Sequence, residues 1–181
     1  MIDYPFLPFT AINATPGTGI AIASATRTTR ADTECALALR ATNDVVILPQ
    51  RLSLTCRTAG TGVTAIFLAL AIETDWRRSS GGTLLTVSDT RTPADPTGLE
   101  VYFGNITMTA PTVGQSRIIW HEQLTTAAPT VGQRLDVNFA DDVGQWPQVA
   151  VPFGRSLVLY WWATGQSASP TYEPKLLFGV R

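Results

Sequence analysis

Apolar and polar side chains alternate with a period of two along most of this chain. In RLSLTC the alternation places Leu52, Leu54 and Cys56 on one face, and EVYFGNITMT and QRLDVNF repeat the pattern. Such alternation is typical of strands with one buried face. It predicts strands near residues 19–26, 34–41, 44–48, 51–58, 63–73, 83–88, 100–109, 116–123, 133–139, 148–151, 155–163 and 174–180.

Segments rich in glycine and proline separate these predicted strands. Examples are ATPGTG, TAGTG, RRSSGG and DDVGQWP, and the hexapeptide APTVGQ occurs twice, at 110–115 and 128–133. Glycine supplies positive φ angles, and proline interrupts hydrogen-bonded ladders. Turn signals at spacings of roughly 8–15 residues indicate an all-β sandwich or barrel. We expect an antiparallel β-sandwich.

Two of the predicted strands are apolar on both faces. In RSLVLYWWA, Trp161 shares one face with two leucines, whereas Val158, Tyr160 and Trp162 share the other, and the strand at 63–73 is similar. Apolar residues on both faces indicate burial on both faces. One face belongs to the sandwich core, and the other must meet a second protein surface, a long loop or a ligand. We expect Tyr160 and Trp162 to lie at an interface.

The chain begins with MIDYPFLPF, a segment that is too apolar for water and too rich in proline for a helix. It contains Tyr4, Phe6, Leu7 and Phe9. Such a segment can pack on a neighbouring subunit as an extended arm, and we expect these four residues to make that contact. The alternative is that the segment lies along its own sheet as an outer cover.

The following ATPGTG segment acts as a hinge in this interpretation. We therefore divide the chain into an extended N-terminal arm at 1–16 and a β-sandwich domain at 17–181. A chain of 181 residues is long enough to bury a core without a disulfide or a metal.

The charge balance speaks against a nucleic-acid partner. The formal net charge is −1, and only 15% of the residues are charged. A nucleic-acid-binding surface needs an excess of cations. A surface with so few charges resists association poorly, which suggests that neighbouring molecules cover much of it.

The sequence also gives no sign of a membrane or secretory segment. We expect no signal peptide, because residues 1–15 lack a basic region followed by an apolar core. The longest apolar run, 63–72, is too short to span a bilayer. Cys35 and Cys56 lie in alternating apolar patterns, which favours two buried free thiols over a disulfide.

The residues that usually perform catalysis are scarce. His121 is the only histidine and Lys175 the only lysine, and neither lies in a phosphate-binding, hydrolase or zinc motif. Asp141 and Asp142 fall in a turn that could offer oxygens to calcium, but solvated turn residues explain them better. We expect no enzyme activity, no catalytic residues, no cofactor and no metal.

Two tryptophans in loops suggest a different class of function. Trp76 in TDWRRSS and Trp146 in GQWPQ could each stack on a sugar ring, as in a carbohydrate-binding module. Trp76 with Arg77 could also anchor a protein interface, because tryptophan and arginine are common at such positions. A glycoside hydrolase with two distant carboxylates is a third possibility, and it rests only on fold analogy.

These features together resemble a known family. An N-terminal extended segment, a charge-poor sequence and a sandwich pattern over 17–181 look like the decoration (cement) proteins of tailed-phage heads. VAVPFGRSLVLYWWATG followed by PKLLFGVR is similar to trimeric jelly rolls of the tumour-necrosis-factor-like type. The resemblance implies a jelly-roll sandwich.

The same resemblance implies a function. The chain would be a structural virion protein that forms a homotrimer and binds the major capsid protein at the capsid surface after assembly in the host cytoplasm. It would have no nucleic-acid or membrane partner. The alternative is a carbohydrate-binding or receptor-binding module of a phage fibre.

Overall fold

The computed structural model describes residues 7–22, 27–89, 98–125, 128–139 and 149–181, and in these ranges the chain forms twelve strands and no helix. All strand pairs are antiparallel, and the strands form two sheets. The prediction of an all-β antiparallel sandwich is confirmed, while its jelly-roll type stays a prediction.

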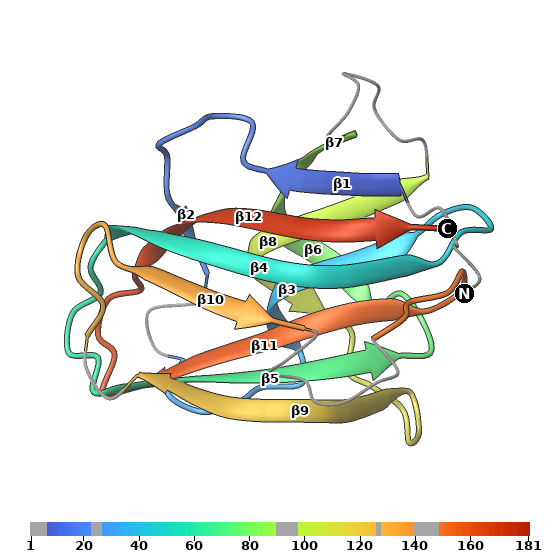
Figure 1. The fold of residues 1–181 in the computed structure, drawn as a ribbon. Coiled ribbons are helices and arrows are strands. Elements are labelled where there is room, and N and C mark those ends of the chain that lie inside the picture. The colour runs from blue at the N-terminus through green and yellow to red at the C-terminus, as the bar shows by residue number, and fades with distance from the viewer. Residues whose placement is uncertain (1–6, 23–26, 90–97, 126–127, 140–148) are drawn as a thin grey trace.

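The first sheet has the strand order β10-β4-β12-β1-β7, with the short β2 also paired to β12. Figure 1 shows β1, β12, β4 and β10 side by side in one layer. The strands of this sheet are β1 (Leu7–Ile12), β2 (Ile20–Ala21), β4 (Ile47–Thr58), β7 (Thr86–Asp89), β10 (Arg134–Asn138) and β12 (Thr171–Val180).

The second sheet has the order β6-β8-β3-β11-β5-β9. In Figure 1 its strands β11, β5 and β9 lie together below the first sheet. Its strands are β3 (Glu34–Ala41), β5 (Ala65–Glu73), β6 (Arg78–Leu84), β8 (Leu99–Met108), β9 (Ser116–Thr125) and β11 (Ser156–Thr164).

The core lies between the two sheets and follows the period-two pattern. Leu52, Leu54 and Cys56 of β4 are fully buried in it, as the alternation predicts. Trp161 of β11 and Tyr172 of β12 are also fully buried there and meet edge to face, with 5.3 Å between ring centres. Both cysteines are buried and free, so the prediction of two buried thiols is confirmed.

The predicted strands at 44–48 and 51–58 form one strand, β4, despite the proline between them. Pro49 pairs with Phe178 of β12, and the pairing shifts register beside it, so that Gln50 is left out of the ladder. A bulge of this kind allows a proline within a strand because the ladder is already interrupted there. The segment 148–151 contributes only a bridge from Val151 to Ile47.

The N-terminal segment belongs in part to the sandwich. β1 lies between β12 and β7, with Phe9 opposite Phe178. The ring of Phe9 is 5% exposed and stacks on Phe178 with 5.8 Å between ring centres. Residues 7–12 therefore follow the alternative that we considered, a segment along its own sheet, and residues 1–6 lie outside the described residues.

Strands β5 and β11 are buried on both faces, as predicted. Leu68 and Leu70 of β5 belong to the core between the sheets, whereas Ala69 and Ala71 belong to a second cluster on the outer face. This second cluster, here called the outer cluster, consists of Cys35, Ala38, Ala69, Ala71, Ile106, Met108, Val158 and Tyr160.

Candidate functional site

The outer cluster is covered by the chain's own residues. The guanidinium carbon of Arg30 lies 5.6 Å from the centre of the Tyr160 ring, and Tyr160 is 1% exposed. The backbone carbonyl of Asp32 accepts a hydrogen bond from Arg77 over the same face. The sequence left open whether a second protein surface, a long loop or a ligand would lie against this face. The structure shows a loop of the chain itself there.

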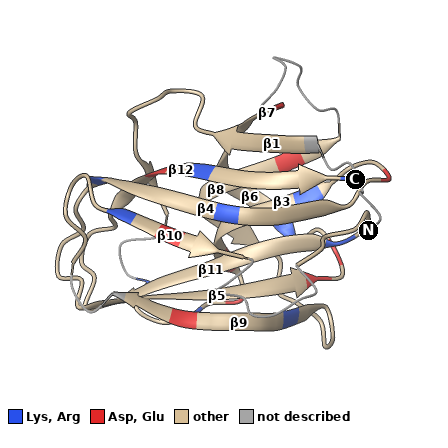
Figure 2. Cartoon of the chain, in the orientation of Figure 1, with Lys and Arg blue, Asp and Glu red and all other residues tan. Residues whose placement is uncertain are grey.

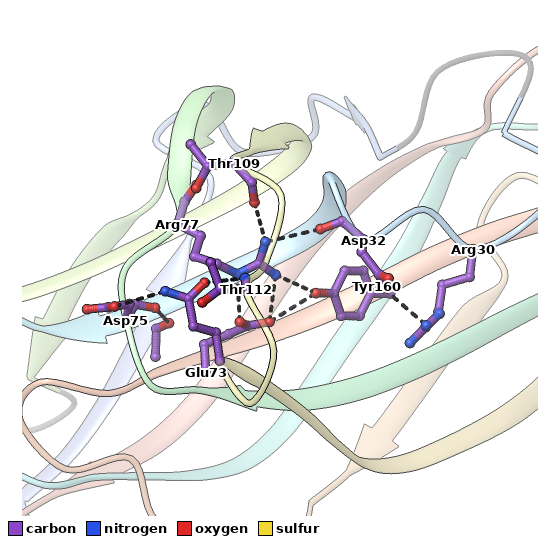
Figure 3. Close-up of polar contacts among 10 residues, drawn as sticks. Arg30, Asp32, Glu73, Asp75, Arg77, Thr109, Thr112 and Tyr160 are labelled. Carbon is purple, nitrogen blue, oxygen red and sulfur yellow. Dashed lines mark hydrogen bonds and ion pairs between the residues drawn. The ribbon is translucent and has the colours of Figure 1, made fainter.

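A buried polar network closes one end of the outer cluster (Figure 3). Arg77 donates to both carboxylate oxygens of Glu73, with 2.7 Å from Nε to Oε2 and 2.9 Å from Nη2 to Oε1. Its Nη2 also donates to the Tyr160 hydroxyl at 2.8 Å, and that hydroxyl donates to Glu73 Oε1 at 2.9 Å. Its Nη1 donates to the carbonyls of Asp32 and Thr109.

All five N–H donors of Arg77 are therefore used, which is what a buried guanidinium requires. The hydrogen bonds to Glu73 raise the pKa of Arg77 above its usual value, although burial acts in the opposite direction. Burial, followed by the charge of Glu73, raises the pKa of the Tyr160 hydroxyl. We predicted Arg77 and Tyr160 as interface residues, but both side chains are buried within the chain and unavailable to a neighbour.

Trp76 lies beside this network in a row of alternating arginines and aromatic rings. The Arg78 guanidinium carbon lies 3.6 Å from the centre of the Tyr102 ring, and that of Arg40 lies 4.5 Å from Trp76. The two rings are 6.1 Å apart. Glu100 accepts a hydrogen bond from Arg40 Nε at 2.8 Å, which fixes the guanidinium over the indole. The contacts with Arg40 and Tyr102 fix the position of the half-buried Trp76 ring.

A pocket of about 280 Å³ opens beside Trp76. Phe153 and Arg155, which precede β11, form another part of its lining, and Phe153 is 55% exposed. Asp75 adds a carboxylate that accepts a hydrogen bond from Gln115. Aromatic rings with guanidinium groups at the margin can hold a planar or ring-shaped ligand that bears a negative charge. Sequence reasoning selected Trp76 but missed Phe153 and Arg155, because the fold and not the spacing brings them to it.

Trp162 is half-buried at the other end of the outer face. Its ring is stacked on that of Phe67, its cross-strand partner on β5, with 5.4 Å between ring centres and 7° between planes. Of the residues predicted as an interface, Trp76 and Trp162 thus keep partial exposure, but they lie on different parts of the face.

The N-terminal residues predicted to contact a neighbour are distributed differently. Phe9 packs inside the sandwich, in the core between the two sheets. Leu7 pairs through its backbone with Val180. Tyr4 and Phe6 lie outside the described residues, as does Trp146 of the carbohydrate hypothesis.

The outer face of the first sheet is polar. A pocket of about 220 Å³ there is lined by Arg51, Ser53, Thr55, Arg134, Lys175 and Leu177. Burial acts to raise the pKa of the neighbouring Asp136, but hydrogen bonds from Arg51, Ser53 and Arg134 outweigh it and lower this pKa to about 2. Figure 2 shows basic positions on β4, β10 and β12 of this sheet, together with acidic positions on β10 and β12.

The described residues contain no group of three or more histidine, cysteine or acidic side chains that could hold a metal ion. His121 is exposed on β9, next to the exposed Glu122. Nor do the described parts of the chain include a helix of sufficient length and apolarity to cross a bilayer.

Comparisons with known proteins give no family. No family model matches the chain, and no curated protein matches it. Among solved structures, a chain of the T13 infectious bursal disease virus particle aligns with 11% identity and a TM-score of 0.21. The VP2 subviral particle of the same virus aligns with 12% identity and a TM-score of 0.12.

These alignments cover 96% and 98% of this chain. The chain spans only 39% and 40% of the length of those viral chains. At TM-scores of this size, the likeness assigns no function.

Proposed function

We propose that this chain is a structural virion protein that binds and stabilises a phage capsid shell, as a decoration (cement) or minor capsid protein. The observation that supports this proposal is the strand order. Eight strands form two facing four-stranded sets, β10-β4-β12-β1 and β3-β11-β5-β9. Of the remaining strands, β7 extends the first set, β8 and β6 extend the second, and the short β2 pairs with β12.

This order fits the predicted jelly roll. Along the chain, β1, β4, β10 and β12 fall in one sheet, and β3, β5, β9 and β11 fall in the other. The first and last strands are neighbours, and the chain crosses repeatedly from one sheet to the other. A double-sheet jelly roll has eight strands in two Greek keys, and this architecture is common in viral capsid and lectin domains. Because a fold does not by itself define function, the proposal rests on analogy with such capsid domains.

The proposed partners are the major capsid protein and further copies of this chain, and the proposed location is the capsid surface. A homotrimer is the form that the family resemblance implies. The apolar outer faces of β5 and β11, which first suggested self-association, are largely filled by the chain itself. Contacts between copies must therefore use other surfaces. We propose no catalytic role, no cofactor and no nucleic-acid or membrane partner.

Co-sedimentation tests the capsid proposal. Purified full-length chain is mixed with phage heads that lack their decoration protein, and the heads are pelleted. We expect the chain to pellet in a fixed ratio to the coat protein and to raise the temperature at which the heads break. A chain that stays in the supernatant with every head tested, and leaves head stability unchanged, contradicts the proposal.

The pocket beside Trp76 favours a second candidate, a carbohydrate-binding or receptor-binding module. Trp76 and Phe153 offer aromatic surface, and Arg155 offers a cation for a sugar carboxylate. Addition of an acidic sugar such as glucuronate should change the tryptophan fluorescence of the wild type and not that of Trp76→Ala. No binding to any sugar on a glycan array, together with unchanged tryptophan fluorescence, would contradict this second candidate.

A further inference from the structure

Strand β9 ends the second sheet and has a long outer edge. It is ten residues in length and pairs with β5 on one side, and it is the terminal strand in the order of that sheet. The opposite terminal strand, β6, has two register shifts, as β9 does, but it also contains two positive-φ glycines, Gly81 and Gly82. Glycines within a strand weaken it. The terminal strands of the first sheet, β7 and β10, have only four and five residues.

The β9 edge bears one basic and one acidic residue. Arg117 and Glu122 are both exposed, and neither has an ion pair within the described part of the chain. In Figure 2, β9 carries one blue and one red position, which lie apart along the strand. Between them Ile118 is 40% exposed, and Ile119 and Trp120 are half-buried.

A bulge brings the two charges to the same face of the sheet. Residues five apart on a regular strand point to opposite faces. Here Arg117 pairs with Ile72 and Glu122 pairs with Leu68, which are four apart on β5 and share one face. The register shift between Leu70 and Ala71 leaves Ile119 unpaired and accounts for the difference.

This arrangement makes the edge self-complementary. If two β9 strands meet antiparallel about a twofold axis between Ile119 and Trp120, Arg117 of each copy lies opposite Glu122 of the other. Ile118 then lies opposite His121, and both of these are on the outer face, since they pair with Ala71 and Ala69. In each residue pair across this contact, the two side chains point to the same face of the joined sheet, as antiparallel pairing requires. Without the bulge this register would place the charges on opposite faces.

We propose that β9 is a docking edge for a second copy of this chain, which joins two sandwiches through one continuous sheet. A second copy fits better than an unrelated strand, because the edge presents opposite charges at positions that its own twofold symmetry pairs. Arg117 and Glu122 face the inner side of the sheet, as their partners Ile72 and Leu68 do, and inward-facing charges without a partner discourage the addition of an unrelated strand. A second copy gives each of these charges a partner. The proposal is independent of the capsid function, and either can hold without the other.

Charge reversal tests the proposal in the full-length protein. Sedimentation velocity over a dilution series gives the dimer dissociation constant of the wild type, Arg117→Glu, Glu122→Arg and the double variant. Each single reversal opposes like charges twice per dimer and should weaken association about tenfold or more. The double reversal exchanges the charges and should restore association to within about threefold of the wild type. Lys175→Glu, on the other sheet, is the matched control and should leave it unchanged.

Hydrogen exchange of the wild type gives a second measurement that needs no variant. Backbone amides of β9 should exchange more slowly as the protein concentration rises, whereas those of the other terminal strand, β6, should not. A wild type that is monomeric at all concentrations overturns the proposal. So do single reversals with unchanged dissociation constants, or a double reversal that fails to restore association while far-UV circular dichroism shows a folded chain.

Discussion

Arg77 connects four separate parts of the chain through its five N–H donors. It contacts Glu73 at the end of β5, Tyr160 on β11 and the carbonyls of Asp32 and Thr109 in two loops. A buried cation and anion in this geometry define which loop lies over the outer cluster. The sequence could not reveal this role. Exposed interface anchors are also often an arginine and a tryptophan in a polar loop, and the sequence does not distinguish them from this buried pair.

Glu73→Gln should strongly destabilise the protein. The amide leaves the buried guanidinium of Arg77 without its counter-charge, and breaking a buried pair in this way costs about 3–5 kcal/mol. Tyr160→Phe should cost less, about 1–3 kcal/mol, because it removes one hydroxyl and no charge. Urea unfolding measures both. Lys175→Gln, an exposed residue, should change the free energy of unfolding by less than about 0.5 kcal/mol. Equal effects for Glu73→Gln and Lys175→Gln would contradict a role for the network.

Asp136 should make stability depend on acid pH. Its pKa in the folded protein is about 2, which is below the value of about 3.9 for an unfolded aspartate. The ionised carboxylate therefore stabilises the fold above about pH 4, and this contribution is lost as the pH falls toward 2. We expect the stability difference between wild type and Asp136→Asn to be largest above pH 5 and to shrink over that window. Urea titrations across this pH range measure it, and a constant difference would contradict the assignment.

At the scale of elements, alternation predicted the strands where side chains are apolar and failed where they are not. β3 matches its predicted range, and β11 and β8 differ from theirs by a residue at each end. The strand predicted at 83–88 is divided between the end of β6 and the start of β7, which lie in different sheets. β6 begins at Arg78 because RSSGG, which has no apolar alternation, pairs with β8. Residues 7–12 were predicted as part of an arm because MIDYPFLPF is apolar and its prolines exclude a helix. They form β1 instead, and Pro8 lies at the start of that strand.

The repeated hexapeptide APTVGQ forms the same turn twice. In each copy the glutamine side chain accepts from the threonine N–H, at 2.7 Å for Thr112 and 3.0 Å for Thr130. Gly114 and Gly132 have φ angles of 84° and 85°. The sequence indicated shared loop chemistry, and the structure supplies its physical basis.

Alanine at these two glycines should cost similar amounts of stability. An added Cβ meets nothing within 4 Å at either site, so only the positive φ opposes it, at about 1–2 kcal/mol. Gly62→Ala should cost more, because its Cβ would lie 2.4 Å from the carbonyl oxygen of Gly165. Thermal unfolding of the three variants measures the order. A Gly62 variant no worse than the other two would contradict this ranking.

At the scale of the whole molecule, the predicted boundary at residue 16 divides a strand from its sheet. β1 supplies Phe9 and Ala11 to the core, so the sandwich includes residues assigned to the arm. Arginines and aromatic rings stack on one another across the outer face, and the fold assembles them from strands distant in sequence.

Truncation distinguishes the part of the N-terminal segment that the sandwich needs. Removal of residues 1–12 takes away β1 and exposes its partners β12 and β7, so we expect an unfolded or aggregated chain. Removal of residues 1–6 leaves every pairing of β1 in place and should preserve the cooperative unfolding transition. Light scattering of this shorter truncation then reports whether residues 1–6 contribute to association.

Phe9→Ala refines the same comparison without a change in length. It should cost about 3–5 kcal/mol, because it opens a cavity against Phe178 in the core. Phe153→Ala removes the same side chain from an exposed position and should cost less than about 0.5 kcal/mol. If Phe9→Ala instead preserved stability and reduced only the mass in solution, Phe9 would contact a neighbouring copy. The sandwich would then have to hold together without it, against the packing that the structure places there.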